Sequence, residues 1–195
     1  GAGGVIAIGS STFNVNQTAN GNYAGSINGA GNVVKTGAAT LTLSGAAGSF
    51  APANLAIQQG SVAVNGAGIL DNALSVSVSS GAGLTLITGN QTIRNLSGSG
   101  TLALNGNNLI LAQGGSFAGA VTGSGNVQVS SGVFSVASIL TSTVATSVLA
   151  NSAVNVAATG TFNAPTVNVL GTMDVQGTIN STTNNITGVL HLGNS

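Results

Sequence analysis

The chain has 195 residues, and only four of them carry a charge at neutral pH: Lys35, Asp71, Arg94 and Asp174. Charged residues make up 2% of the sequence, whereas soluble domains usually contain about 25%. Two cations cannot neutralise a nucleic-acid backbone or an anionic membrane surface. Cysteine is absent, which excludes disulfides and thiolate metal sites.

Disorder is not expected either, although glycine alone accounts for 31 residues. Disordered segments combine low hydrophobicity with high net charge, whereas this chain is 43% hydrophobic and has no net charge. The most apolar stretch, residues 133–156, is interrupted by Ser, Thr and Asn every few residues. A spanning helix needs about 20 predominantly apolar residues, so we expect no membrane span.

Large apolar residues alternate with small polar ones in short segments. In chain order these segments are 41–43, 62–64, 74–78, 84–86, 102–104, 127–129, 154–156, 167–169 and 190–192. A period of two places the apolar residues on one face of a strand, and Phe134 and Phe162 are expected to point into the core. Gly, Asn and Ser between the segments favour turns. No helical periodicity competes with this pattern, so the sequence predicts an all-β fold.

Internal repeats suggest how the strands are arranged. Residues 23–33 and 117–127 share the pattern aromatic-Ala-Gly-x-aliphatic-x-Gly-x-Gly-Asn-Val, and G-x-G triplets start at Gly29, Gly98 and Gly123. Their separations of 69 and 25 residues predict three turns and one turn of a unit of roughly 23 residues. Shorter glycine-led units follow at 160–162, 171–173, 177–179 and 188–190.

A unit of this length predicts one coil of a solenoid, in which each strand pairs in parallel with its equivalent one coil further on. We expect a single domain over residues 1–195 with roughly eight to nine coils, stacked at ~4.8 Å per coil into a rod of about 40 Å. An antiparallel arrangement stays open near either terminus, where residues 5–8 could instead be an edge or exchanged strand.

Residues 27–50 resemble the strand repeat associated with bacterial autotransporter passenger domains, G-x-G-x-[LV]-x-K-x-G-x-G-x-L-x-L-x-G. The matching positions are Gly29, Gly31, Val33, Lys35, Gly37, Leu41, Leu43 and Gly45, and Ala39 departs from the pattern. Residues 98–114 match more loosely, with Asn105 in place of the lysine. The resemblance implies a secreted or surface-displayed right-handed parallel β-helix, with its translocator barrel outside this chain. A start at Gly1, without Met or signal peptide, fits a mature or excised piece.

Few side chains are available for chemistry. Asp71 and Asp174 lie 103 residues apart, more than four coils, so they are not expected to form the carboxylate pair of a glycosidase. His191 alternates with two leucines and is expected to face solvent. Lys35 and Arg94 are expected to be solubilising charges, although Lys35 could instead bond the carbonyls of a neighbouring coil. We therefore predict no enzyme and no catalytic, cofactor-binding or metal-binding residue.

The G-x-G triplets are not predicted to bind phosphate, because no helix and no Lys-Ser/Thr pair follows them. They are instead expected to mark tight corners between strands.

The predicted function follows from the missing charges. Natural sheets avoid edge-to-edge pairing with Lys, Pro and inward charges, and these are nearly absent here. We predict a self-associating structural or adhesive element of a bacterial cell surface, assembled through strand edges or solenoid ends into a fibre or matrix layer. A host or abiotic surface is a further predicted partner.

The alternative is a carbohydrate- or ice-binding solenoid. Regular threonine ranks on one flat face would favour ice binding. The threonines at 40, 42, 85, 92, 101, 141 and 143 are not expected to recur at the coil period, which argues against this alternative.

Overall fold

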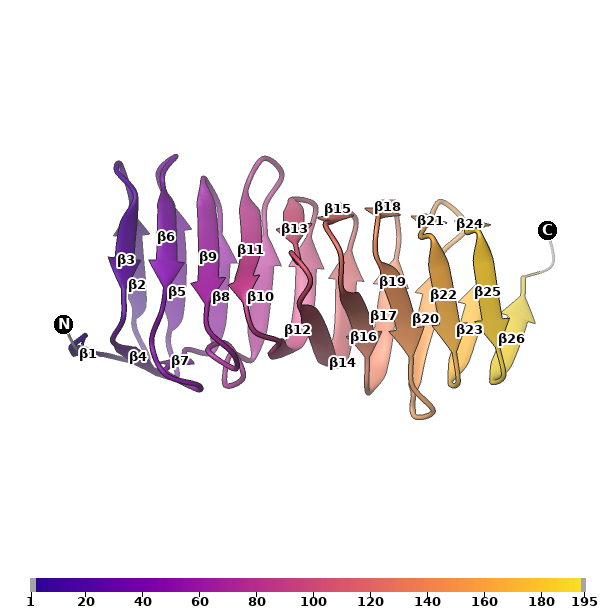
Figure 1. The fold of residues 1–195 in the computed structure, drawn as a ribbon, viewed down its shortest axis with the longest axis horizontal. Helices are drawn as coiled ribbons and strands as arrows, with labels where there is room; N and C mark the ends of the chain where they lie inside the picture. Colours follow the sequence, from indigo (N-terminus) through magenta and orange to yellow (C-terminus); the bar gives the residue numbers. More distant parts are fainter. Residues whose placement is uncertain (1–2, 194–195) are drawn as a thin grey trace.

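The structure, a computed structural model, describes residues 3–193, which form 26 β-strands and no helix. Residues 1–2 and 194–195, part of the predicted domain, lie outside the described range. The strands wind about one long axis as a solenoid of about nine turns, with β1 (Val5–Gly9) and β26 (Val189–Leu192) at opposite ends of the rod (Figure 1). The prediction of an all-β solenoid with eight to nine coils is confirmed. Residues 3–193 include no helix with the length and hydropathy needed to cross a membrane.

A regular coil contributes one strand to each of three faces. Face 1 opens each coil and contains β1 (Val5–Gly9), β4 (Ser26–Gly29), β7 (Phe50–Ala51), the first halves of β12 (Gln91–Gly98) and β14 (Asn108–Phe117), β16 (Asn126–Val129), β19 (Ala145–Val148), β22 (Thr166–Val169) and β25 (Thr183–Ile186).

Face 2 follows face 1 in every coil. It contains β2 (Thr12–Asn16), β5 (Asn32–Thr36), β8 (Asn54–Ile57), β10 (Ser75–Val78), the second halves of β12 and β14, β17 (Gly132–Val136), β20 (Ser152–Val156), β23 (Thr172–Val175) and β26 (Val189–Leu192). The long strands β12 and β14 bend from one face onto the next and so join the two faces into one sheet.

Face 3 closes the coil as a nine-stranded sheet. It contains β3 (Gly21–Tyr23), β6 (Thr40–Leu43), β9 (Ser61–Asn65), β11 (Gly83–Thr88), β13 (Thr101–Ala103), β15 (Ala120–Thr122), β18 (Ile139–Ser142), β21 (Thr161–Asn163) and β24 (Thr178–Asn180). We number the nine coils by these strands; β25 and β26 begin a tenth.

Pairing between strands of the described chain is parallel, including at both ends. β1 pairs with β4 and places Ile6 opposite Ile27, while β26 pairs with β23 and places Leu190 opposite Met173. Residues 5–8 are therefore part of the first coil. The alternative of an antiparallel arrangement is wrong for these segments, and β1 is the edge strand of its sheet.

Coil length varies along the rod and is shortest at the C-terminal end. The coil that places Ile27 opposite Phe50 is among the longest, and it is several residues longer than the coil that places Met173 opposite Leu190. The predicted repeat unit therefore matches the longest coils and overestimates the others. It was overestimated because the glycine triplets that set it are not equivalent positions in successive coils.

The three triplets mark three different corners. Gly29 ends β4 before β5, Gly98 ends β12 before β13, and Gly123 lies between β15 and β16. The two copies of the eleven-residue pattern accordingly lie on different faces, with Ile27 on face 1 and Val121 on face 3. The prediction that the triplets count whole turns is wrong, although the expectation that they lie at corners is confirmed. What they share is local, because all three first glycines have a positive φ that a residue with a Cβ rarely adopts.

The core is a continuous column of apolar side chains inside the three faces. Phe134 and Phe162 are buried as predicted, and the alternating segments from 41–43 to 167–169 place their large apolar residues inward, with one exception. Leu74 is 41% exposed because it precedes β10 and lies at a corner. Leu190 and Leu192 continue the inward columns of Met173 and Val175 but are 41% and 69% exposed in the last coil.

Face 1 is interrupted in the fourth coil, where residues 66–74 form turns instead of a strand. The side chain of Gln91, which is buried, bridges this gap. Its Oε1 accepts the Leu70 N–H at 3.0 Å, and its Nε2 donates to the carbonyls of Gly66 at 2.6 Å and Gly89 at 3.2 Å. One amide side chain therefore replaces the backbone pairing that the turns remove.

Candidate functional site

The two aspartates lie far apart along the rod. Asp71 is at the turn before β10 in coil 4, and its Oδ1 accepts the Thr92 N–H at 2.7 Å. Asp174 lies on β23 in coil 9. Five coils at ~4.8 Å separate them by about 24 Å along the axis. The structure therefore does not bring these carboxylates together.

Asp174 instead faces His191 in the next coil. The two residues are opposite each other on β23 and β26, with His191 Nδ1 2.5 Å from Asp174 Oδ1. Both side chains are exposed, as expected for outward positions, and such surface pairs contribute little to stability. Sequence reasoning missed the contact. Their separation along the chain equals the length of the final coil, but the sequence repeat had suggested a longer coil.

Lys35 is fully buried on β5, between Val15 and Ile57 in an inward column. Its Nζ donates to the carbonyls of Thr36 and Gly37 at 2.8 Å and to that of Gln59, in the following coil, at 3.1 Å. The interpretation of Lys35 as a solubilising charge is wrong, and the alternative of bonding to a neighbouring coil is confirmed. Desolvation by burial lowers the pKa of the Lys35 ammonium from its ordinary value.

Arg94, the other cation, is exposed, whereas Lys35 is buried. Arg94 lies at the bend of β12, where the pairing register with β14 shifts between Ile93 and Asn95. Its side chain is exposed, and the described residues provide it with no salt bridge. It agrees with the expectation of a solubilising surface charge.

The outward positions of face 3 form two columns of small residues. One column runs Thr40, Ser61, Gly83, Thr101, Ala120 and Thr141. The neighbouring column runs Thr42, Ala63, Thr85, Ala103 and Thr122. Threonines thus recur in register only every second or third coil, which agrees with the expectation that they do not recur at the coil period. The uneven number of residues per coil hid this register in the sequence.

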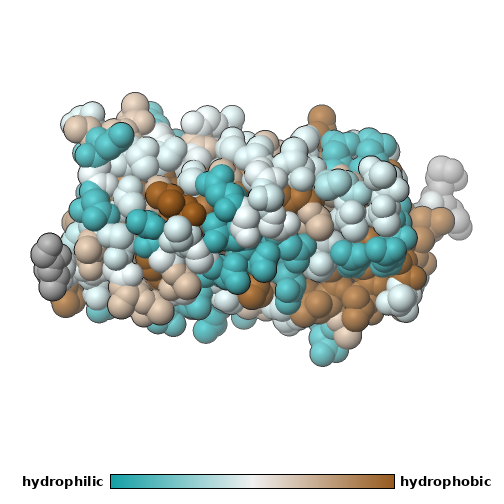
Figure 2. Space-filling view, viewed as in Figure 1, coloured by the Kyte–Doolittle hydropathy of each residue, from teal (hydrophilic) through white to brown (hydrophobic). Residues whose placement is uncertain are grey.

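Exposed apolar side chains gather on the C-terminal coils, where Figure 2 shows a hydrophobic region toward the end of the rod. Val133 and Val189 belong to one outward column of face 2, and Leu170 lies at the adjoining corner; each is 49–55% exposed. A hollow of about 300 Å³ lies beside Val133, against residues 150–153. We call Val133, Leu170 and Val189 the apolar strip.

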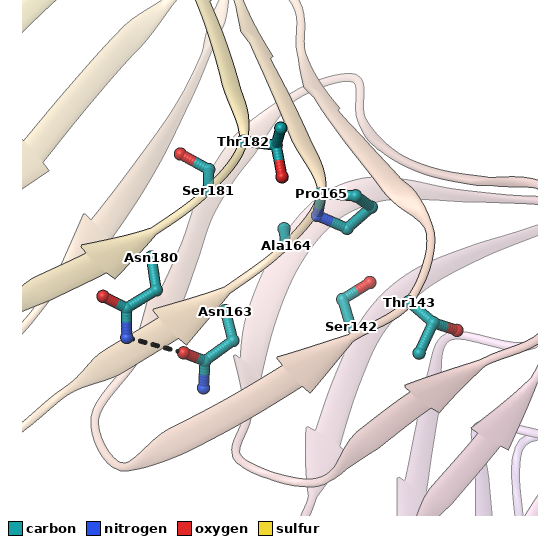
Figure 3. Close-up of a pocket in the computed structure, with 8 residues that line it drawn as sticks. All are labelled: Ser142, Thr143, Asn163, Ala164, Pro165, Asn180, Ser181 and Thr182. Atoms are coloured by element: carbon teal, nitrogen blue, oxygen red, sulfur yellow. Dashed lines mark hydrogen bonds between the residues drawn. The ribbon is translucent and has the colours of Figure 1, made fainter.

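Another hollow lies at the corner between faces 3 and 1 in coils 7 to 9 (Figure 3). It has a volume of about 550 Å³ and is lined by residues 142–143, 163–165 and 180–182. We call it the corner groove. Its lining contains hydroxyl, amide and small apolar side chains and no charged group. Among the described residues no group of three or more His, Cys, Asp or Glu side chains could hold a metal ion.

Comparisons with known proteins add no assignment to this geometry. No family model matches the chain, and neither the curated proteins nor the solved structures give a match. The fold itself places the chain in the class of parallel β-solenoids.

Proposed function

We propose that this protein is a non-catalytic structural or adhesive element of a bacterial cell surface, and that copies of it associate into a fibre or matrix layer. The observation that carries the proposal is an outer surface with almost no charge and with an apolar strip at one end. Charged side chains are the usual barrier to association between β-proteins. Exposed apolar patches mark interaction surfaces.

The outward columns support this reading. The central outward column of face 2 carries Ser77, Ser97, Ser116 and Ser135 in four successive coils. Small neutral side chains in register give a flat surface with little electrostatic repulsion toward a second copy. Only four residues in the whole sequence carry a charge, and Lys35 is buried, so even fewer act at the surface.

The resemblance of residues 27–50 to autotransporter passenger repeats supports the cell-surface location. Lys35, one of the matching positions, bonds carbonyls at two successive corners, which gives the lysine of that pattern a structural role in this chain. A parallel solenoid with a continuous apolar core also suits a stiff extracellular rod.

Sedimentation velocity of the purified chain over a range of concentrations tests self-association. We expect species larger than the monomer that increase with concentration, and filaments or sheets in negative-stain images. Val133→Lys, which places a charge in the apolar strip, should weaken association at least tenfold.

Asn28→Lys is the matched control, because Asn28 is exposed on β4 at the other end of the rod. It adds the same charge outside the strip and should leave association nearly unchanged. A monomer at every concentration would contradict self-association, and equal effects of the two substitutions would contradict the role of the strip.

Ice binding is a second candidate because of the threonine columns on face 3. Thr42, Thr85 and Thr122 share one column, with alanines between them, and the neighbouring column is equally small and neutral. A flat array of hydroxyl and methyl groups at the regular spacing of a sheet could order a layer of water. A thermal-hysteresis measurement decides this candidate: no hysteresis for the intact chain excludes it.

A further inference from the structure

The corner groove combines an apolar floor with a polar rim. Ala164 is buried at its base, and Pro165 presents its ring beside it (Figure 3). Around this floor stand Asn163, Asn180 and Thr182. A volume of about 550 Å³ lies within the range of about 300–1,000 Å³ that is typical of small-molecule sites.

The groove is held open by backbone pairing between coils. Ala164 N–H donates to the Asn180 carbonyl at 3.0 Å, and Thr182 N–H donates to the Pro165 carbonyl at 3.1 Å. On the coil 7 side, the hydroxyl of Ser142 is buried and donates to the Val144 carbonyl at 2.9 Å. These contacts fix the rim before any ligand arrives, which reduces the entropy lost on binding.

The two asparagines leave donors and acceptors available. Asn180 Nδ2 donates to Asn163 Oδ1 at 2.8 Å, as the dashed line in Figure 3 marks. That bond uses one hydrogen of Asn180 and one oxygen of Asn163, so the Asn163 amide nitrogen and the Asn180 amide oxygen stay available. An amide donor and an amide acceptor side by side suit neighbouring hydroxyl groups, because each hydroxyl both donates and accepts.

The charge of the ligand is also restricted. No Lys, Arg, Asp, Glu or His lines the groove. A phosphate, carboxylate or ammonium group would lose its hydration here without gaining a partner of opposite charge. The preferred ligand is therefore neutral, rich in hydroxyl groups, and has one apolar face to lie on Ala164 and Pro165.

From this geometry we infer that the corner groove is a binding site for a neutral saccharide of one or two sugar units, either free or at the end of a glycan chain. The apolar face of the ring packs on Ala164 and Pro165, while Asn163, Asn180 and Thr182 bond its hydroxyls. The site needs neither a second copy of the chain nor the apolar strip. It therefore goes beyond the proposed function and does not depend on it.

Amide correlation spectra of the ¹⁵N-labelled chain test the site. The probes are maltose, cellobiose, lactose and diacetylchitobiose, with sialyllactose as the charged counterpart. We expect at least one neutral probe to shift the side-chain amide signals of Asn163 and Asn180, with a dissociation constant in the range of about 1–10 mM typical of shallow sites. An array of immobilised glycans separates a free sugar from a chain end as the preferred form.

Asn163→Leu removes the amide at nearly constant volume and should weaken binding about tenfold. The matched control is Asn168→Leu. Asn168 makes the same bond on face 1, accepting from Asn185 Nδ2 at 2.8 Å across one coil, and lies outside the groove. Circular dichroism melting checks that both variants fold.

Binding by a folded Asn168→Leu chain together with weakened binding by Asn163→Leu supports the site. The inference is overturned if no neutral probe shifts the Asn163 and Asn180 signals, or if both substitutions weaken binding equally. Preferential binding of sialyllactose would also overturn it. A chain that stays monomeric can either bind the sugar or fail to bind it. The outcome of this test is therefore independent of the outcome of the self-association test.

Discussion

Lys35 shows how a charged side chain is accommodated in the core of the solenoid. Its ammonium lies under two successive corners and satisfies carbonyls that the strand ladders leave at those corners. Of its three acceptors, the Thr36 carbonyl also accepts the Gln17 N–H. The desolvation that lowers the pKa of the ammonium opposes folding, while hydrogen bonds to a charged donor contribute about 1.5–3 kcal/mol each. The bonds offset part of this cost and give the Gly37 and Gln59 carbonyls a donor.

Lys35→Met should therefore lower the free energy of unfolding by about 2 kcal/mol. Methionine keeps the unbranched stem in the column between Val15 and Ile57 but leaves corner carbonyls without a donor. Urea unfolding followed by circular dichroism measures the change. The control is Arg94→Met, which removes the other cation from an exposed bend and should change stability by less than about 0.5 kcal/mol. A Lys35→Met chain as stable as the unmodified one would contradict this role.

At the scale of the elements, face 1 has no strand in the fourth coil, and the side chain of Gln91 supplies hydrogen bonds there instead. The turns at residues 66–74 separate β7 from the first half of β12, and Gln91 reaches across to pair the backbone of Leu70 and Gly66. β12 and β14 then carry the sheet around the corner onto face 2. At this interruption the Gln91 amide takes the place of a paired strand, because an amide supplies both a donor and an acceptor.

Gln91→Leu tests this repair. Leucine has a similar volume, but the Leu70 N–H and the Gly66 carbonyl lose their partner in a buried position, at a cost of about 2 kcal/mol. We expect a lower midpoint of urea unfolding and faster hydrogen exchange at the Leu70 amide. Gln128→Leu, at an outward position of β16, is the control and should affect neither quantity. Unchanged exchange at Leu70 would show that the turns hold without the amide.

Across the whole molecule, each inner coil is covered by a coil on either side, whereas the first and last coils are covered on one side only. An inward column of face 2 contains Leu96 in the fifth coil and Leu190 in the last. Leu96 is fully buried, whereas Leu190 is 41% exposed. At the other end, a partly open apolar hollow of about 130 Å³ is lined by Ile6, Phe13, Val15, Tyr23, Ile27 and Leu41. Packing in such a stack is a sum of neighbouring contacts.

The position along the rod should therefore decide the cost of removing the same side chain. We expect Leu96→Ala to lower the free energy of unfolding by about 3 kcal/mol and Leu190→Ala by less than about 1 kcal/mol. Thermal and urea unfolding of both variants measure these values. Equal costs would mean that the last coil is covered in solution, for instance by a second copy.

The sequence by itself determined the class of fold. Alternation such as Leu84-Thr85-Leu86 is enough to place side chains on two faces of a strand, because side-chain direction along a strand depends only on the local backbone. Glycines 29, 98 and 123 were likewise recognisable as corners, because a positive φ is a local requirement. The approximate number of coils also followed, although the predicted repeat unit matched only the longest coils.

Only the tertiary structure decided which residues meet across coils. Coils differ in length, from the long one between Ile27 and Phe50 to the short one between Met173 and Leu190. The residues that pair in successive coils therefore cannot be found by applying one fixed period to the sequence. The Asp174–His191 contact, the threonine columns and the corner groove all depend on that register. The burial of Lys35 depends on it as well, because its third acceptor belongs to the following coil. Local sequence sets the direction of a side chain, whereas stacking sets its neighbours.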